Sequence, residues 1–331
     1  MRGSGASWLT RAALPLLQRL PPETAHELGL RGLRLLQDCW PPRAVDRTLE
    51  VKLFGLQFAH PVGLAAGFDK NGDYLDALGA LGFSHIEVGT VTPRPQAGNP
   101  PPRLFRLRGE RALVNRMGFN NKGADYVAER LQRSSWRGIR GVSIGKNADT
   151  PLERAAEDYV ACARRLYAVA DYLAVNVSSP NTQGLRKLQA AEALAGVLDP
   201  LRKECLRLAQ LHQRRVALLV KISPDLDAQE LHEVCEVLPR NGVDGVIATN
   251  SSARQDGGLS GAPLTARSLE VLRRLRIGLG AEFPIIGVGG LMSADDVVAR
   301  LLAGASLVQL YTGLVYAGPR LVRDCIRRLP A

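Results

Sequence analysis

The sequence contains few cysteines, and none of them lies in a pattern that binds a metal. Its 331 residues include 5 cysteines, which are scattered along the chain without a CxxC pair. This usage is typical of a reducing compartment, and it argues against structural zinc, an iron–sulfur cluster or a disulfide framework. We therefore expect no metal site.

Acidic residues and long apolar runs are also scarce. The formal net charge is +11, which favours an anionic partner such as nucleic acid, lipid headgroups or a small metabolite. No apolar run approaches the roughly 18 residues that a transmembrane helix needs. The N-terminus is basic and faintly similar to an organelle transit peptide, but it lacks the small-residue cleavage site of a secretory signal.

Short β-rich runs alternate with helical stretches from His60 onward. The helical stretches include Leu152–Ala170 and Ala228–Leu238, where apolar residues recur at helical spacing. Eight apolar runs, each followed by a helix, predict an α/β fold, the (β/α)8 TIM barrel. A doubly wound open sheet is the alternative, although it usually has fewer strands. The runs are HPVGLAAG, SHIEVGTV, RGVSIGKN, DYLAVNVS, RVALLVKIS, VDGVIATN, FPIIGVGG and ASLVQLYTG.

Each of these runs ends in glycine or in a polar side chain. In a parallel barrel the carboxyl ends of all strands meet on one face, which carries the active site in this fold. One polar end alone would indicate a solvated loop, but eight of them predict a functional site. The ends are Ala66-Gly67, Gly89-Thr90, Gly145-Lys146, Asn176-Ser178, Lys221, Thr249-Asn250, Gly289-Gly290 and Tyr311-Thr312.

Lysine, asparagine and glycine at these ends indicate the kind of ligand. Lys221 follows four apolar residues, and a lysine there needs an anion or a reactive carbonyl to offset its desolvation. A salt-bridged or snorkelling lysine is the alternative, and it is favoured for Lys70 alone. Asn176 and Asn250 interrupt apolar strands, and their amides match the ring edge of a pyrimidine or flavin. The motifs GVGG and YTG favour a phosphorylated ligand.

An ordered set of motifs resembles one known family. AAGFDKNG, EVGTVTPRPQAGNP, NRMGFNN, NVSSPNTQGLR, VKISPDL and GASLVQLYTG are similar to motifs of the membrane-associated, quinone-dependent class of dihydroorotate dehydrogenases. The resemblance extends from Thr24 to Pro319, and NVSSPNT and GTVTPRPQ are its most specific motifs. It implies a barrel that contains FMN and oxidises dihydroorotate to orotate in pyrimidine synthesis, with a membrane quinone as electron acceptor.

The resemblance also implies roles for individual residues. Ser179 matches the catalytic base, and because serine is a poor base it must relay the proton onward. The implied FMN contacts are Ala66, Gly67, Thr90, Ser143, Asn176, Lys221, Thr249, Gly261, Gly290, Tyr311 and Thr312. The implied substrate contacts are Lys70, Asn115, Arg116, Met117, Gly118, Phe119, Asn176, Asn181, Asn250 and Ser251. Two features depart from the family: Ser143 replaces its usual asparagine, and the segment between Asn250 and Gly261 is shorter.

Residues 1–44 are expected to form an N-terminal extension, and residues 45–331 the FMN-binding barrel. SWLTRAALPLLQRL and PETAHELGLRGLRLLQ predict two short amphipathic helices that lie on an anionic membrane surface. Packing on the barrel is the alternative, and both can hold at once. In the resembling family this extension leads quinone to FMN, and His26 and Arg106 match positions near the quinone. We expect a monomer on the cytoplasmic face of a bacterial inner membrane, with the mitochondrial inner membrane as the alternative.

Three other functions compete with this interpretation. A tRNA dihydrouridine synthase generally uses a cysteine acid and an RNA-binding domain, neither of which is visible, so we expect no nucleic-acid partner. A Schiff-base aldolase would use Lys221 and would not contain flavin. A non-catalytic phosphate-binding barrel on a membrane would not turn over dihydroorotate.

Overall fold

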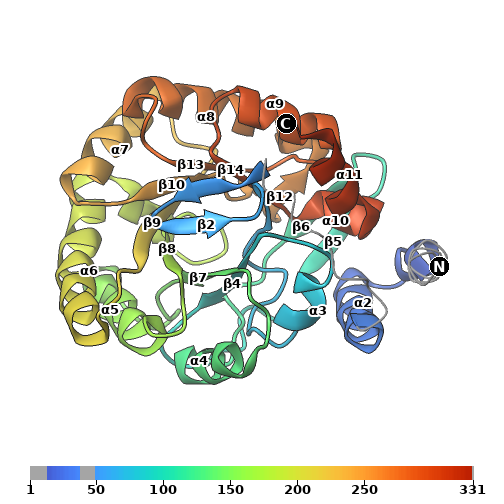
Figure 1. Cartoon of the computed structure of the whole chain (residues 1–331), viewed down its shortest axis with the longest axis horizontal. Coiled ribbons are helices and arrows are strands. Elements are labelled where there is room, and N and C mark those ends of the chain that lie inside the picture. Colours follow the sequence, from blue (N-terminus) through green and yellow to red (C-terminus); the bar gives the residue numbers. More distant parts are fainter. Residues whose placement is uncertain (1–12, 38–48, 330–331) are drawn as a thin grey trace.

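Eight parallel strands pair in chain order and close into a barrel (Figure 1). The computed structural model describes residues 13–37 and 49–329. Each barrel strand coincides with one of the eight apolar runs, so the predicted TIM barrel is confirmed. The strands are β3 (Val62–Leu64), β4 (His85–Val91), β7 (Ile139–Ile144), β8 (Tyr172–Asn176), β9 (Ala217–Ile222), β10 (Gly245–Ala248), β13 (Ile285–Val288) and β14 (Leu307–Leu310).

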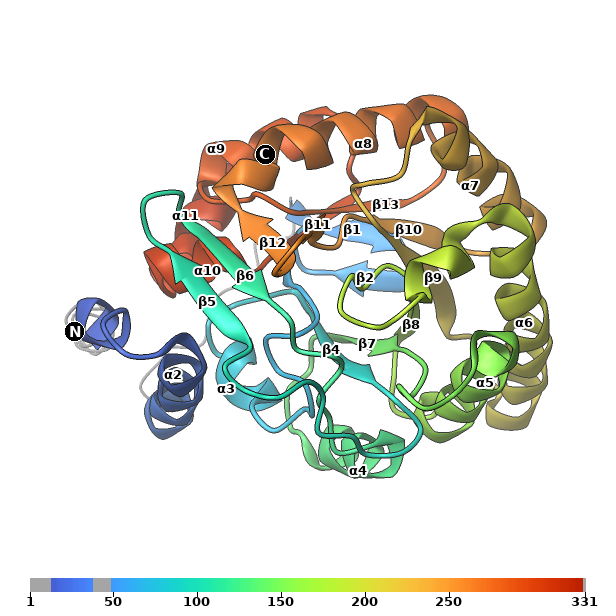
Figure 2. The same ribbon diagram turned by 180° about the vertical axis from the view of Figure 1, so that it is seen from behind.

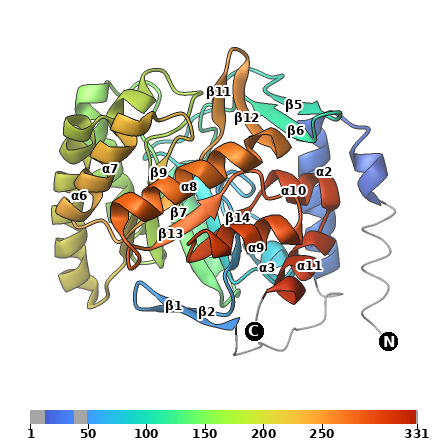
Figure 3. The same cartoon turned by 90° about the horizontal axis from the view of Figure 1, so that it is seen from above.

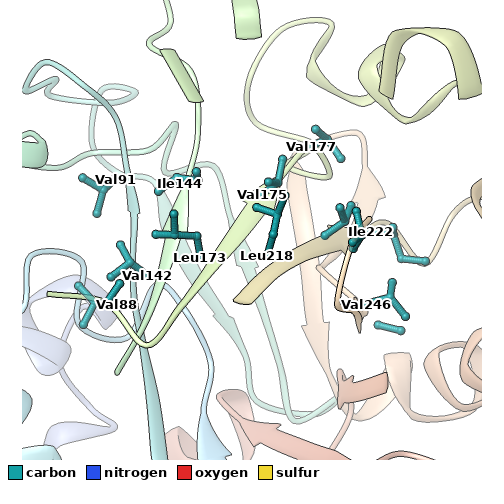
Figure 4. Packing of buried hydrophobic residues seen from close by; sticks show 14 of the residues in the cluster. Val88, Val91, Val142, Ile144, Leu173, Val175, Val177, Leu218, Ile222 and Val246 are labelled. Carbon is teal, nitrogen blue, oxygen red and sulfur yellow. The ribbon is translucent and has the colours of Figure 1, made fainter. Parts of the chain in front are cut away.

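Helices surround the barrel and bury the outward-facing side chains of its strands. Figure 4 shows this layer, in which Val88, Val142 and Leu173 belong to one large apolar cluster. One helix, α7, begins at a capping box, where Asp227 and Glu230 each accept a hydrogen bond from the other's backbone N–H. The outer helices are α3 (Leu75–Gly79), α4 (Ala124–Arg133), α5 (Ala155–Leu166), α6 (Ala191–His212), α7 (Ala228–Arg240), α8 (Thr265–Leu279), α9 (Ala294–Leu302), α10 (Thr312–Ala317) and α11 (Arg320–Arg328).

Two small sheets close the opposite ends of the barrel (Figure 3). The hairpin of β1 (Val51–Leu53) and β2 (Leu56–Phe58) lies at the amino ends of the strands, where Phe58 is completely buried. A four-stranded antiparallel sheet lies at the carboxyl ends. Its order is β11 (Ser252–Arg254), β12 (Gly257–Gly261), β6 (Ala112–Asn115) and β5 (Leu104–Leu107). The sequence did not predict these sheets, because their short strands carry no extended apolar alternation.

The N-terminal extension lies against one side of the barrel (Figures 1 and 3). Residues 13–17 are helical, and α2 (Pro22–Leu36) follows within the second predicted amphipathic stretch. The predicted boundary between residues 44 and 45 lies outside the described residues. Within 13–37 and 49–329, the structure contains no helix with the length and apolarity required to span a bilayer.

Candidate active site

Residues at the carboxyl ends of the barrel strands line a polar cavity. Figure 2 views this end of the barrel, where the four-stranded sheet lies. The fold therefore brings residues that are far apart in the sequence to one place. Among the predicted cofactor contacts, the lining includes Ala66, Gly67, Thr90, Asn176, Lys221, Thr249, Gly261, Gly290, Tyr311 and Thr312. The lining also includes the predicted catalytic residue Ser179. The predicted substrate contacts in it are Lys70, Asn115, Met117, Gly118, Phe119, Asn181, Asn250 and Ser251.

Two of the predicted cofactor and substrate contacts do not line this cavity. Ser143 is completely buried, and its hydroxyl lies 2.9 Å from the hydroxyl of Thr90, which does line the cavity. The guanidinium of Arg116 lies over the Phe105 ring, 5.2 Å from its centroid, and donates to the Pro102 carbonyl at 3.2 Å. Ser143 therefore contacts the lining through Thr90, whereas the Arg116 side chain contacts Phe105 and Pro102, which do not line the cavity.

Asparagine side chains around the cavity hold one another in fixed orientations. Asn176 Nδ2 donates to Thr90 Oγ1 at 2.8 Å, and Asn250 Nδ2 lies 3.3 Å from Asn176 Oδ1. In a second pair, Asn181 Nδ2 donates to Asn115 Oδ1 at 2.8 Å. Oriented amides of this kind can recognise planar rings with alternating N–H and C=O groups.

Ser179 lies at the cavity surface with a free hydroxyl proton. Its side chain is 6% exposed, and its Oγ accepts a hydrogen bond from the backbone N–H of Asn181 at 3.2 Å. Within the described part of the chain, no group accepts the Ser179 hydroxyl proton. The hydroxyl can therefore turn toward a ligand in the cavity.

Lys70 supplies a positive charge to the cavity, and the pKa of its ammonium group is unusually low. Its Nζ donates to the Gly67 carbonyl at 3.1 Å. Burial lowers the pKa of Lys70 to about 8; nearby Glu23 opposes this fall, and Arg103 adds to it. The ammonium is thus protonated at neutral pH, where it can bind a carboxylate.

A buried ion pair lies at the floor of the cavity. Lys221 Nζ is 3.4 Å from Glu87 Oε1, and both side chains are almost completely buried. Glu87 Oε2 accepts hydrogen bonds from Gln309 Nε2 at 2.9 Å and from the Tyr172 hydroxyl at 3.2 Å. Gln309 Oε1 has no partner in the described structure, and Gln309 lines the cavity. Because Glu87 occupies the amide nitrogen, the free carbonyl of Gln309 can accept an N–H from a bound ring.

Glycines at the other end of the cavity leave backbone N–H groups available. A Cβ on Gly290 would lie 2.3 Å from the Cα of Thr265, so no larger residue fits this turn. Within the described chain, the N–H groups of Gly290 and Leu291 have no hydrogen-bond partner, and both residues line the cavity. Unpaired N–H groups in a glycine turn suit a phosphate. The cavity therefore combines groups suited to a ring with groups suited to a phosphate, as FMN requires.

Comparison with known proteins identifies the family. The family model described as Dihydroorotate dehydrogenase matches residues 48–331. The chain belongs to the dihydroorotate dehydrogenase family. Two similar relatives carry the name Dihydroorotate dehydrogenase (quinone). The Chromobacterium violaceum protein is 52% identical, with 95% of each chain covered. The Bordetella parapertussis protein is 50% identical, with 96% of each chain covered.

Solved structures of the family share this architecture. The crystal structure of DHODH from Eimeria tenella in complex with ferulenol has a TM-score of 0.84 and 36% sequence identity. The comparison covers 93% of this chain and 90% of that chain. The predicted family and barrel fold are thereby confirmed.

This dihydroorotate dehydrogenase family member also contains an apolar cavity of about 440 Å³ beneath its N-terminal extension. Residues from 13–36, β5 and α10 line it, together with the predicted quinone-site residues His26 and Arg106. Arg106 donates to the backbone carbonyl of Gln18 at 2.7 Å, which ties the extension to β5. The extension therefore packs on the barrel and encloses a cavity at the same time.

A thin aromatic wall separates the apolar cavity from the polar one. Phe68 lines the apolar cavity, Tyr311 lines both, and their rings meet edge to face at 5.4 Å. His26 Nε2 donates to the Phe68 carbonyl at 2.8 Å. Burial, together with the charge of Lys70, lowers the pKa of His26 to about 3. His26 is therefore neutral at physiological pH, and its Nδ1 is left as a hydrogen-bond acceptor.

Several cavity residues of this family member were missed by sequence reasoning. Gln309 is the clearest case, together with Glu87, which lies behind the lining and binds Gln309; Ser260 and Leu264 also line the polar cavity. Glu87 and Gln309 each interrupt an apolar strand run, in IEVGT and LVQLYTG. A polar residue in a buried run needs a partner, as Lys221 does, and this signal would have identified both.

Proposed function

We propose that this protein oxidises dihydroorotate to orotate with FMN as its bound cofactor and a membrane quinone as electron acceptor, as a step of pyrimidine synthesis. The observation that carries this proposal is the contact, at Phe68 and Tyr311, between an almost wholly apolar cavity and a cavity lined by many polar side chains. A polar substrate and an apolar electron acceptor could thus approach one cofactor from different sides. The printed names of the relatives agree with this pairing.

In this proposal the polar residues hold the substrate and remove its proton. Lys70 pairs with the substrate carboxylate, while Asn115, Asn181 and Asn250 bind the amide edges of its ring. Ser179 accepts the proton that leaves the substrate carbon and passes it to water, because its own Oγ is a weak base. Bound FMN would take up the hydride from the neighbouring carbon and deliver the electrons to quinone.

Other residues would hold the cofactor. The floor of the cavity, with Lys221 and Gln309, offers a cation and an acceptor to the ring. The turn at Gly290 would bind the phosphate, with Thr312 beside it. Ser143 would contribute only through Thr90, to which it is hydrogen-bonded.

The N-terminal extension would admit the quinone from the membrane. Exposed leucines on it include Leu28 at 45% and Leu35 at 84% exposure, with Arg31 and Arg34 on the same helix. Apolar side chains beside arginines favour a peripheral position on an anionic bilayer surface. We place residues 1–44 in this role and residues 45–331 in catalysis. The protein would act as a monomer on the cytoplasmic face of a bacterial inner membrane.

The visible spectrum tests the proposed reaction. The purified protein should be yellow, and anaerobic dihydroorotate should bleach its flavin absorbance. Subsequent addition of a quinone should restore the colour. A colourless protein, or a flavin that dihydroorotate does not reduce, would disprove the proposal.

Liposome binding tests the membrane position. Leu35→Glu should weaken binding to vesicles that contain anionic lipid, because it places a charge on the proposed membrane-facing helix. Ile277→Glu is the matched control, since Ile277 is also 84% exposed but lies on α8. Equal binding by both variants would reject the proposed orientation.

A further inference from the structure

A buried arginine lies behind the glycine turn that faces the polar cavity. Arg300 belongs to the last turn of α9 and is only 1% exposed. Its side chain crosses β13 at Gly287, where a Cβ would lie 2.5 Å from Arg300 Cγ. The first glycine of GVGG therefore makes room for this arginine, whereas Gly290 forms the turn itself.

No carboxylate of the described residues forms an ion pair with the Arg300 guanidinium, although Asp296 on the same helix raises its pKa from a longer distance. Its Nη2 donates to the Gly289 carbonyl at 2.8 Å and to the Ser268 hydroxyl at 3.0 Å, and it lies 3.4 Å from the Thr265 carbonyl. Its Nε and Nη1 have no partner in the described structure. Burial lowers the pKa of Arg300 to about 10, so the guanidinium remains charged at neutral pH. Asp296 stabilises the Arg300 charge only in part, since the pKa stays lowered and two N–H groups stay unpaired, so a purely structural role explains this buried cation poorly.

The peptide groups of the turn connect Arg300 to the cavity. The Gly289 carbonyl and the Gly290 N–H belong to one trans peptide, so they point in opposite directions. Arg300 and Ser268 bind the carbonyl end, and the N–H end has no partner. The next peptide repeats this arrangement, because Thr265 Oγ1 donates to the Gly290 carbonyl at 2.7 Å and leaves the Leu291 N–H free.

We propose that Arg300 is a positioning residue for the cofactor phosphate. It holds the Gly289–Gly290 peptide with its N–H directed at the phosphate, and it supplies a buried positive charge behind that peptide. A carbonyl bound to a cation is polarised, so the N–H of the same peptide becomes a stronger donor. The phosphate in turn adds to the partial compensation of the Arg300 charge by Asp296. This inference rests on the proposed FMN function.

The test compares FMN with riboflavin, which has the same ring but no phosphate. Flavin-depleted full-length protein is titrated with each compound while flavin fluorescence is followed. In Arg300→Met the FMN affinity should fall by about ten- to hundredfold, the usual effect of losing a charged hydrogen-bond donor. Riboflavin affinity should change by less than about threefold, because the ring contacts remain. Arg300→Lys, which keeps the charge, should recover most of the FMN affinity.

A matched control separates this role from general stabilisation. Arg276 also donates to several backbone carbonyls, including Gly304 and Phe283, but at the opposite end of the barrel. Arg276→Met should leave the ratio of FMN to riboflavin affinity unchanged. If Arg300→Met does not fold, Arg300→Gln replaces it, because the amide still donates but carries no charge; it should show the same FMN-specific loss.

The outcomes distinguish this inference from the proposed function. Equal loss of FMN and riboflavin affinity in Arg300→Met or Arg300→Gln would overturn the phosphate role. An Arg300→Lys variant as weak as Arg300→Met would also overturn it. If the wild-type protein binds neither flavin, the proposed function itself fails.

Discussion

The two cavities that meet at Phe68 and Tyr311 differ in how the chain builds them. The polar cavity is lined by residues on strand ends and adjoining loops of the closed barrel, and its amides are linked by hydrogen bonds. The apolar cavity exists only because the N-terminal extension packs over β5 and α10. Polar contacts hold the described part of that extension to the barrel: Arg103 pairs with Glu23 at 2.8 Å, and Arg106 donates to the Gln18 carbonyl at 2.7 Å.

This difference indicates that the two half-reactions can be separated. In the proposed function, substrate chemistry depends on groups held by the barrel, whereas access of the acceptor depends on the extension that packs against its side. Changes in one cavity should therefore affect one half-reaction and spare the other.

The largest effect should follow from Ser179→Ala. Loss of the proton acceptor should slow reduction of the flavin by dihydroorotate by about 10²–10⁴-fold, while FMN remains bound and reoxidation by quinone is unchanged. Stopped-flow absorbance measures both steps. Ser178→Ala removes a neighbouring hydroxyl that donates to Asn176 Oδ1 and does not line the cavity, so it should slow the step far less. Reduction of Ser179→Ala at the wild-type rate would remove this residue from the mechanism.

Deletion of residues 1–44 should impair the function of the apolar cavity and spare that of the polar one. The shortened chain should lose liposome binding and at least about tenfold of its activity with long-chain quinone, because several apolar side chains leave the membrane-facing surface. Reduction of its flavin by dihydroorotate and electron transfer to a small water-soluble acceptor should persist, provided that it folds. Undiminished turnover of long-chain quinone in a folded, yellow protein would contradict the proposed entrance.

The pH dependence of orotate binding tests the role of Lys70 in the polar cavity. The Lys70 ammonium is present below its pKa of about 8 and is lost as the pH rises through this value. Affinity for the anionic product should therefore fall by up to about tenfold per pH unit above this point. Lys70→Arg keeps its charge and should postpone the fall to higher pH. A flat profile for the wild-type protein would show that Lys70 does not bind the carboxylate.

The smallest effect concerns Ser143. Asparagine at this position has a longer side chain that can reach past Thr90 toward the cofactor. Ser143→Asn should tighten FMN binding by about 0.5–1.5 kcal/mol, the value of one neutral hydrogen bond. Flavin-release titrations measure the difference, and equal or weaker retention of FMN by the variant would count against the prediction.

The sequence by itself determined the barrel and many of the residues that line the polar cavity. A strand covered on both faces must be apolar along its length, so each of the eight runs was visible locally. The polar end of each run was visible too. Because the carboxyl ends of all strands in a parallel barrel lie on one face, the eight polar ends were expected to meet there. For this reason the strand ends alone were enough to predict that Lys221, Asn176 and Asn250 lie in one site, whereas Ser179 was assigned through the family resemblance.

Only the tertiary structure decided which groups face one another. Glu87, Lys221, Tyr172 and Gln309 belong to four different strands, and their hydrogen bonds follow from barrel closure and register. The apolar cavity likewise depends on how an amphipathic helix docks. The leucines of that helix predict an apolar face but do not specify its partner, because apolar burial is non-directional. Contacts between distant residues determine that partner, and they arise only when the chain is folded.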